Sequence, residues 1–158
     1  MVSINADILP AESIGGIVLG SELGHVLEAL SEVRAKSVDR RFSNFGQEYQ
    51  EVTVPDYGIT VIGDSTGTVI RVSCAKPYEG RYRRRYFPGM SIVQLQEIAN
   101  KTLVIHGMIV VDNEFGVAFD FPEVFRDECF DDVDFISQLP DEMPVTEIHV
   151  LDREWWRN

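Results

Sequence analysis

The chain has 158 residues, enough for one domain or two small ones, and it is 44% hydrophobic and 25% charged. This composition is typical of a globular protein and excludes a disordered tail or a coiled coil, and no apolar run reaches the ~20 residues of a membrane helix. The net charge is −12. The molecule as a whole should therefore repel nucleic acid and anionic lipid and attract a basic protein.

The two cysteines, Cys74 and Cys129, form no disulfide framework and have no metal-ligand spacing. We interpret both as reduced thiols in the core. Residues 1–7 lack the basic flank and apolar stretch of a secretory signal. These features predict a cytoplasmic protein, and we expect no cofactor.

The charge is concentrated in the last third of the chain. Residues 1–106 hold 11 basic and 12 acidic side chains, whereas residues 107–158 hold 3 basic and 14 acidic ones, a balance of −11. Such segregation favours a distinct acidic surface, and a solvated loop is the alternative. The acidic residues from 120 to 142, which we take as candidate partner-binding residues, are Asp120, Glu123, Asp127, Glu128, Asp131, Asp132, Asp134, Asp141 and Glu142.

The first elements alternate between glycine-bounded apolar segments and amphipathic stretches. The apolar segment 14–20 predicts a short strand or turn. Ser21 is expected to cap a helix over residues 22–33, because apolar residues recur at helical spacing. The predicted apolar face of this helix is Leu23, Val26, Leu27 and Leu30.

A β-rich region follows. Residues 45–54 have an extended pattern, and β-branched residues alternate over residues 59–62 and 68–74. We predict a hairpin that turns at residues 63–67.

The second half repeats this order of a helix followed by strands. Ser91 is expected to cap a helix whose apolar face is Ile92, Leu95, Ile98 and Ala99. Residues 103–111 and 117–121 predict a hairpin that turns at residues 112–116, and residues 145–151 predict a last strand. His106 would open the first of these apolar strands.

The two hairpins share one spacing, from Gly58 to Gly67 and from Gly107 to Gly116. We therefore predict an α+β fold, an antiparallel sheet with two helices, in a single domain over 1–158. Two tandem helix-plus-β-meander units, about 14–75 and 88–151, would share the sheet. Two independently convergent hairpins are the alternative, because the helix-to-hairpin distances differ.

Three residue patterns that could support chemistry each have a simpler interpretation. Ser65 lies in a G-x-S-x-G sequence, but a strand rather than a helix should follow it, so a hairpin turn is favoured over a nucleophile. The histidines His25, His106 and His149 are too far apart for a metal site, and we interpret them as partly buried structural residues. A weak calcium site is the alternative for the cluster of Asp127, Asp131, Asp132 and Asp134, which lacks EF-hand spacing.

The stretch 78–87 combines arginines with tyrosines and is the best candidate for binding nucleic acid. The alternative is that its arginines neutralise acidic groups of the chain itself, and the net charge favours this. The arginines are Arg81, Arg83, Arg84 and Arg85.

The segment 14–20 with its following helix, the short-turned meander and the acidic second half resemble small bacterial immunity proteins. These neutralise the toxic domains of contact-dependent inhibition and other polymorphic toxin systems. The tandem arrangement also resembles the β-lactamase-inhibitor-protein type of fold. The resemblance implies a cytoplasmic target, since this chain lacks the signal and disulfide pattern of secreted inhibitors.

Together these features predict a non-enzymatic inhibitor that binds a basic toxin domain, a nuclease, through the acidic residues from Asp120 to Glu142. A nuclease cleft is positive because it must attract polyanionic substrate, and carboxylates can occupy it in place of phosphates. The alternative is a nucleic-acid-binding or regulatory module that uses the segment Arg81 to Phe87. We expect no membrane partner.

Overall fold

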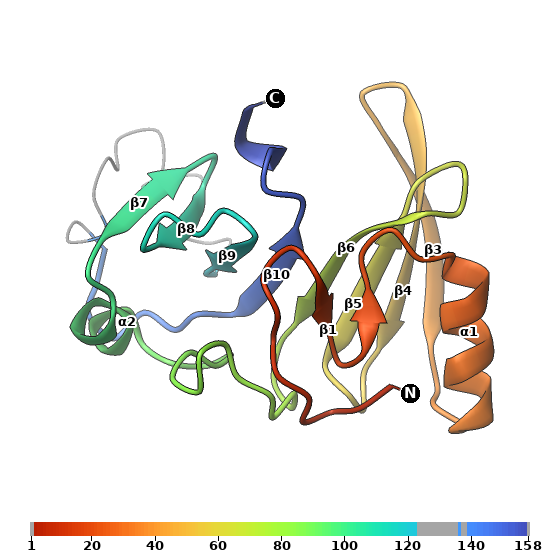
Figure 1. Ribbon diagram of the computed structural model, residues 1–158, viewed down its shortest axis with the longest axis horizontal. Helices are drawn as coiled ribbons and strands as arrows, with labels where there is room; N and C mark the ends of the chain where they lie inside the picture. The colour runs from red at the N-terminus through yellow and green to blue at the C-terminus, as the bar shows by residue number, and fades with distance from the viewer. Residues whose placement is uncertain (1, 123–135, 137–138, 158) are drawn as a thin grey trace.

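The computed structural model describes residues 2–122, 136 and 139–157. Its main sheet has eight antiparallel strands in the order β3-β4-β5-β6-β10-β9-β8-β7, and a separate pair, β1-β2, lies against it (Figure 1). The predicted α+β fold is confirmed. The elements are β1 (Ser13–Ile14), β2 (Ile17–Val18), α1 (Leu23–Glu32), β3 (Val38–Asn44), β4 (Gln47–Val54), β5 (Ile59–Gly63), β6 (Val69–Cys74), α2 (Ile92–Ile98), β7 (Thr102–Ile105), β8 (Met108–Val111), β9 (Val117–Asp120), β10 (Glu147–Leu151) and the 3-10 helix η3 (Trp155–Arg157).

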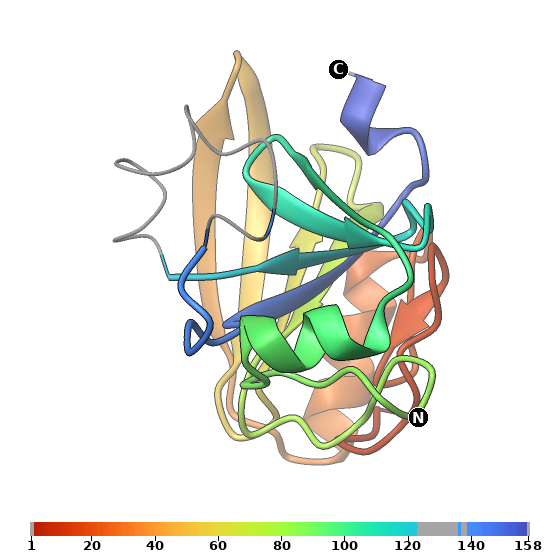
Figure 2. The same ribbon diagram turned by 90° about the vertical axis from the view of Figure 1, so that its left-hand side faces the viewer.

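One face of the main sheet forms the core. Five buried valines stand side by side across five strands, in the order Val52, Val61, Val72, Val150 and Val117. β-branched side chains pack well on a pleated surface, so this row explains why five separate segments pair here. Helix α1 adds its buried apolar face, and it lies with the N-terminal segment on one side of β3 and β4 (Figure 2).

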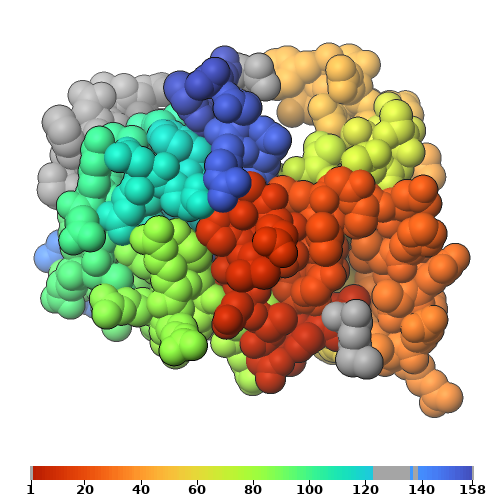
Figure 3. All heavy atoms as spheres, in the orientation of Figure 1, coloured from red at the N-terminus to blue at the C-terminus, as the bar shows by residue number. Residues whose placement is uncertain are grey.

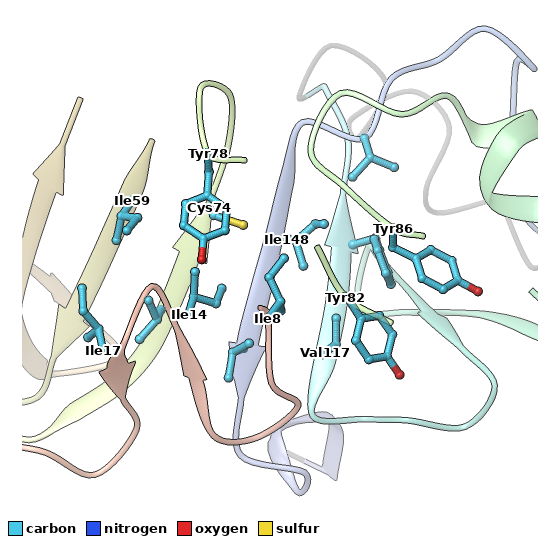
Figure 4. Close-up of a cluster of buried hydrophobic side chains, with 14 of the residues drawn as sticks. Ile8, Ile14, Ile17, Ile59, Cys74, Tyr78, Tyr82, Tyr86, Val117 and Ile148 are labelled. Carbon is cyan, nitrogen blue, oxygen red and sulfur yellow. The ribbon is translucent and has the colours of Figure 1, made fainter. Parts of the chain in front are cut away.

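The N-terminal segment extends this core. Ile8, Ile14 and Ile17 lie in the same buried cluster as Ile59 and Ile148 of the main sheet (Figure 4). The segment is held by backbone hydrogen bonds as well, since Ile8 N–H donates to Arg81 O and Gly20 N–H donates to Val69 O. Residues 2–20 therefore belong to the folded core rather than to a loose tail.

Each helix precedes four strands, and the two sets of strands meet where β6 pairs with β10. In the sheet, β5 lies next to β6 as β9 lies next to β10, so β5 and β9 occupy corresponding positions. The equal spacing from Gly58 to Gly67 and from Gly107 to Gly116 instead matches β5 with β8. That match is therefore offset by one strand, since the first set places both β3 and β4 before β5, and the second places β7 alone before β8. The division into units 14–75 and 88–151 stays a prediction.

Local details confirm some expectations and correct others. Ser91 caps α2 with a full capping box, in which its Oγ accepts from Gln94 N–H and Gln94 Oε1 accepts from Ser91 N–H. Ser21 does not cap α1: Glu22 is the N-cap, and Ser21 Oγ donates to Val18 O instead. Residues 103–111 are not one strand, because His106 and Gly107 adopt positive φ and turn the chain between β7 and β8.

Candidate functional site

The second face of the main sheet carries a polar row. Thr53, Thr60, Ser73 and His149 stand opposite one another on β4, β5, β6 and β10, in register with the valine row but on the reverse side of the strands. A pocket of about 610 Å³ opens over this row. Ionisable residues from four strands and from the β7–β8 turn line it, and they are Glu51, Arg71, His106, Asp120, Glu147 and His149.

Ser73, His149 and Asp120 form a continuous hydrogen-bonded chain at this pocket. Ser73 Oγ lies 2.6 Å from His149 Nδ1, and His149 Nε2 lies 3.2 Å from Asp120 Oδ2. All three residues are buried, with 2%, 3% and 7% of their surfaces exposed. The imidazole tautomer with its proton on Nε2 donates to Asp120 and accepts from the Ser73 hydroxyl at Nδ1, so both ring nitrogens have a partner.

This chain has the residue types of a hydrolase triad, but its setting differs. Ser73 lies inside a central strand that pairs on both sides, whereas a nucleophilic serine stands exposed on a sharp turn, next to free backbone N–H groups that bind the oxyanion. The hydrogen bonds join β6, β10 and β9 across the sheet. The arrangement therefore favours a buried polar network that holds the pocket's floor in place.

A second pocket of about 410 Å³ adjoins the first and shares Arg71 with it. It lies between the β3–β4 hairpin and the C-terminal segment, where the surface is notched (Figure 3). Its wall is aromatic, with Phe42 and Tyr49 on one side and Trp155 on the other. Trp155 is fixed by its Nε1–H, which donates to Phe115 O at 2.7 Å, and by an edge contact with His106.

The structure separates the nine predicted partner-binding acids into three groups. Asp120 is buried and bonded to His149, so its carboxylate is not part of an exposed surface. Asp141 and Glu142 are exposed. The remaining six lie outside the described residues, and they are Glu123, Asp127, Glu128, Asp131, Asp132 and Asp134.

Asp141 and Glu142 stand on a fixed backbone. Val93 N–H donates to Asp141 O, and Ile92 N–H donates to Met143 O, so this segment is bonded to the start of α2. The buried side chain of Met143 anchors it further. The described end of the acidic segment is therefore presented rigidly.

The arginine-rich stretch lies in a tight turn. Tyr82 and Tyr86 pair as an isolated bridge, and their rings are buried and stack at 5.4 Å. Arg83 pairs with Asp112 at 3.3 Å, and Arg81 lies over the ring of Phe87. The tyrosines are thus core anchors whose faces are not available to bases.

Two further candidates from the sequence, Ser65 and His25, lie in a turn and on a helix surface. Ser65 lies in the β5–β6 turn, where Asp64 Oδ1 accepts from Thr66 and Thr68, so the predicted turn is confirmed. These hydrogen bonds lower the pKa of Asp64. His25 is exposed beside Glu22 rather than partly buried, because it falls on the outer face of α1.

Cys74 is a buried thiol of β6, and burial raises its pKa well above the ordinary range. Cys129 and the aspartates of the calcium alternative lie outside the described residues. Across the described ranges, no three His, Cys, Asp or Glu side chains gather as a metal site requires. The described helices are also too short or too polar to cross a membrane.

Sequence reasoning missed the pairing of Ser73 with His149. These residues are 76 positions apart, and their contact depends on β6 pairing with β10. The sequence of each strand contains no local signal for the order of the strands in the sheet.

Comparisons with known proteins give a likeness in fold. No protein-family model matches the chain, and no curated protein matches it in sequence. A solved structure, that of the uncharacterized protein yfeY from Escherichia coli, is similar over 93% of this chain and 99% of its own, with a TM-score of 0.61 and 11% identity. At this identity the likeness shows a shared fold alone.

Proposed function

We propose that this chain is an immunity-type inhibitor that binds and neutralises a cationic toxin domain, a nuclease, in the cytoplasm. The observation that carries the proposal is the separation of charge, with −11 of the −12 in residues 107–158. Within residues 107–158, the structure describes Asp141 and Glu142 as exposed acids on a backbone that is hydrogen-bonded to α2.

The physical basis is electrostatic complementarity. A nuclease concentrates positive charge in its cleft to bind phosphates, and an inhibitor that presents carboxylates can occupy the same site. Opposite charges also raise the association rate toward 10⁸–10⁹ M⁻¹s⁻¹, which suits a protein that must act before damage occurs. Of these acids, Asp141 and Glu142 lie on a backbone that is hydrogen-bonded to α2, so they lose little conformational entropy on binding, which further favours affinity.

The described site supports a binding role rather than catalysis. The hydroxyl of Ser73 and the ring of His149 are both buried and bonded to each other. The pockets above them are lined by charged and aromatic side chains on paired strands, which suits contact with another protein surface.

The test uses the product of the gene immediately upstream as the first candidate toxin. Three variants are compared with the parent in binding and in protection of growth. The first is Asp141→Asn with Glu142→Gln, and the second replaces Asp127, Asp131, Asp132 and Asp134 together by asparagine. The third, a matched control, is Glu28→Gln with Glu32→Gln on α1, which also removes two exposed acids but at the opposite end of the molecule (Figure 1).

We expect the Asp141/Glu142 variant to slow association and to weaken its dependence on salt, as for charges at the rim of an interface. The four-aspartate variant should lose about 2–5 kcal/mol of binding free energy where a carboxylate is buried against a toxin cation. The α1 control should bind like the parent. If both acidic variants fold, bind and protect as well as the parent, the proposal is wrong.

A further inference from the structure

The β3–β4 hairpin extends beyond the rest of the sheet. Its two strands pair from Val38 with Thr53 up to Asn44 with Gln47, but β4 pairs with β5 only from Gln50 onward. Residues 42–49 are therefore a two-stranded ribbon, beside which the described part of the chain places no third strand, and Figure 1 shows it rising above β5 and β6.

The tip of this ribbon carries Phe45, a large apolar residue that makes no buried contact in the described structure. Phe45 and Gly46 form the two-residue turn, with φ of 50° and 76°. Turns with two positive φ values favour Asn-Gly, and a phenylalanine at the first position is strained. The side chain of Phe45 gains nothing in return, because the residue is 98% exposed.

Side-chain contacts link the two strands of the hairpin below the tip. The rings of Phe42 and Tyr49 stack at 5.3 Å, and the Arg40 guanidinium lies over Phe42. Nearer the sheet, Gln50 Nε2 donates to Asp39 Oδ2 at 2.7 Å. Phe45 is therefore held on a preformed support, which reduces the ordering entropy that a contact at the tip would cost.

We infer that the β3–β4 tip is a docking element that inserts Phe45 into an apolar pocket of the partner protein. An aromatic side chain that fills a partner's pocket is the usual anchor of an interface, and a phenylalanine that is both exposed and held at a positive φ fits that role. The neighbouring Asn44 and Gln47 are neutral and polar, so they fit the hydrogen-bonding rim around such a pocket.

The partner is the cationic protein of the proposed function, and the inference rests on that proposal for the partner's identity. The ribbon carries the negative charge of Glu48, and the positive charge of Arg41 at its base offsets it. The tip therefore supplies shape and apolar contact, whereas the acidic segment supplies the electrostatic attraction.

The central variant is Phe45→Asn, which gives the turn its preferred Asn-Gly sequence. We expect it to raise the Tm of the free protein, because the strain is relieved, and to weaken binding of the partner at least tenfold. Phe45→Ala should weaken binding similarly without raising the Tm as much. The matched control, Val38→Thr, removes an exposed apolar group at the other end of β3 and should leave affinity within twofold.

A second experiment places p-benzoylphenylalanine at position 45 in the source cells and identifies the crosslinked protein by mass spectrometry. A basic protein that also binds the purified parent and loses affinity for Phe45→Asn supports the inference. Crosslinks confined to a second copy of this chain, an absence of crosslinks, or affinity of Phe45→Asn within twofold of the parent would overturn it.

The two proposals fail separately. If the acidic variants lose binding and Phe45→Asn retains it, the docking tip is wrong and the charge-based inhibitor stands. If Phe45→Asn loses binding to a crosslinked partner that the acidic variants still bind normally, the tip stands and the charge-based proposal is wrong.

Discussion

The hydroxyl of Ser73 lies 2.6 Å from Nδ1 of His149, and the two residues stand directly opposite each other on β6 and β10. This contact spans the pair of strands at which the two sets of four meet. Because His149 is also hydrogen-bonded to Asp120, a substitution at Ser73 affects the buried hydrogen-bond network of all three residues.

The first prediction is that Ser73→Ala destabilises the protein by about 1–3 kcal/mol, since it leaves a buried ring nitrogen without its partner. Thr53→Ala is the matched control: its hydroxyl is only part-buried and lies 3.4 Å from that of Thr60, so the loss should stay below that of Ser73→Ala. Urea unfolding at pH 7 measures both. Equal losses would show that the Ser73–His149 bond contributes nothing particular.

A second prediction concerns Glu114 and Arg153, which form two parallel hydrogen bonds of 3.0 and 2.9 Å. The Arg153 guanidinium holds the pKa of Glu114 below its ordinary value of 4.5. The pair therefore stabilises the fold above pH 4.5, and this contribution is lost as the pH falls through the lowered pKa of the folded state.

Arg153→Gln should cost about 1 kcal/mol or less at pH 7, because Arg153 is 57% exposed and solvent screens the pair. The difference from the parent should shrink toward zero as the pH falls below 4.5. Arg157→Gln removes a pair in which both side chains are exposed and should cost less at pH 7. A difference for Arg153→Gln that stays constant down to pH 2.5 would contradict the assignment.

The elements that sequence reasoning located have a strong local signal. The apolar spacing of Leu23, Val26 and Leu30 and the Ser91–Gln94 capping box both depend on residues close together in the chain. Strand β3 was missed because it is an edge strand exposed along nearly its whole length, so it shows no alternation of apolar and polar residues. The β7–β8 turn was missed because the apolar run around it continues almost unbroken.

The site was harder to predict for a related reason. His149 and Ser73 each looked like an ordinary strand residue, and their contact arises from the long-range pairing of β6 with β10. The exposed Phe45 gave no signal in sequence, since a phenylalanine among polar residues is as easily assigned to a core. Only the position of the turn reveals that its side chain faces water.

A third prediction concerns nucleic acid. Because the rings of Tyr82 and Tyr86 are buried, the arginine turn can offer phosphate contacts but no stacking. Labelled single-stranded RNA at physiological salt should bind no more tightly than the ~10⁻⁴–10⁻⁶ M of nonspecific association. Submicromolar affinity that is lost when Arg84 and Arg85 are replaced by glutamine would instead support a nucleic-acid-binding module.

The last prediction compares two buried tyrosines whose hydroxyls differ in surroundings. Tyr78 OH donates to Ala6 O, whereas Tyr86 OH has no hydrogen-bond partner in the part of the chain that the structure describes. Burial raises the pKa of both phenols, so both stay protonated at pH 7.

Tyr78→Phe should cost about 1 kcal/mol of unfolding free energy, because it leaves the Ala6 carbonyl without its donor. Tyr86→Phe should leave stability unchanged or raise it by up to about 1 kcal/mol, since it removes a hydroxyl that was buried without compensation. Denaturant unfolding of the two variants at pH 7 decides the matter, and a greater loss for Tyr86→Phe than for Tyr78→Phe would contradict this account of the core.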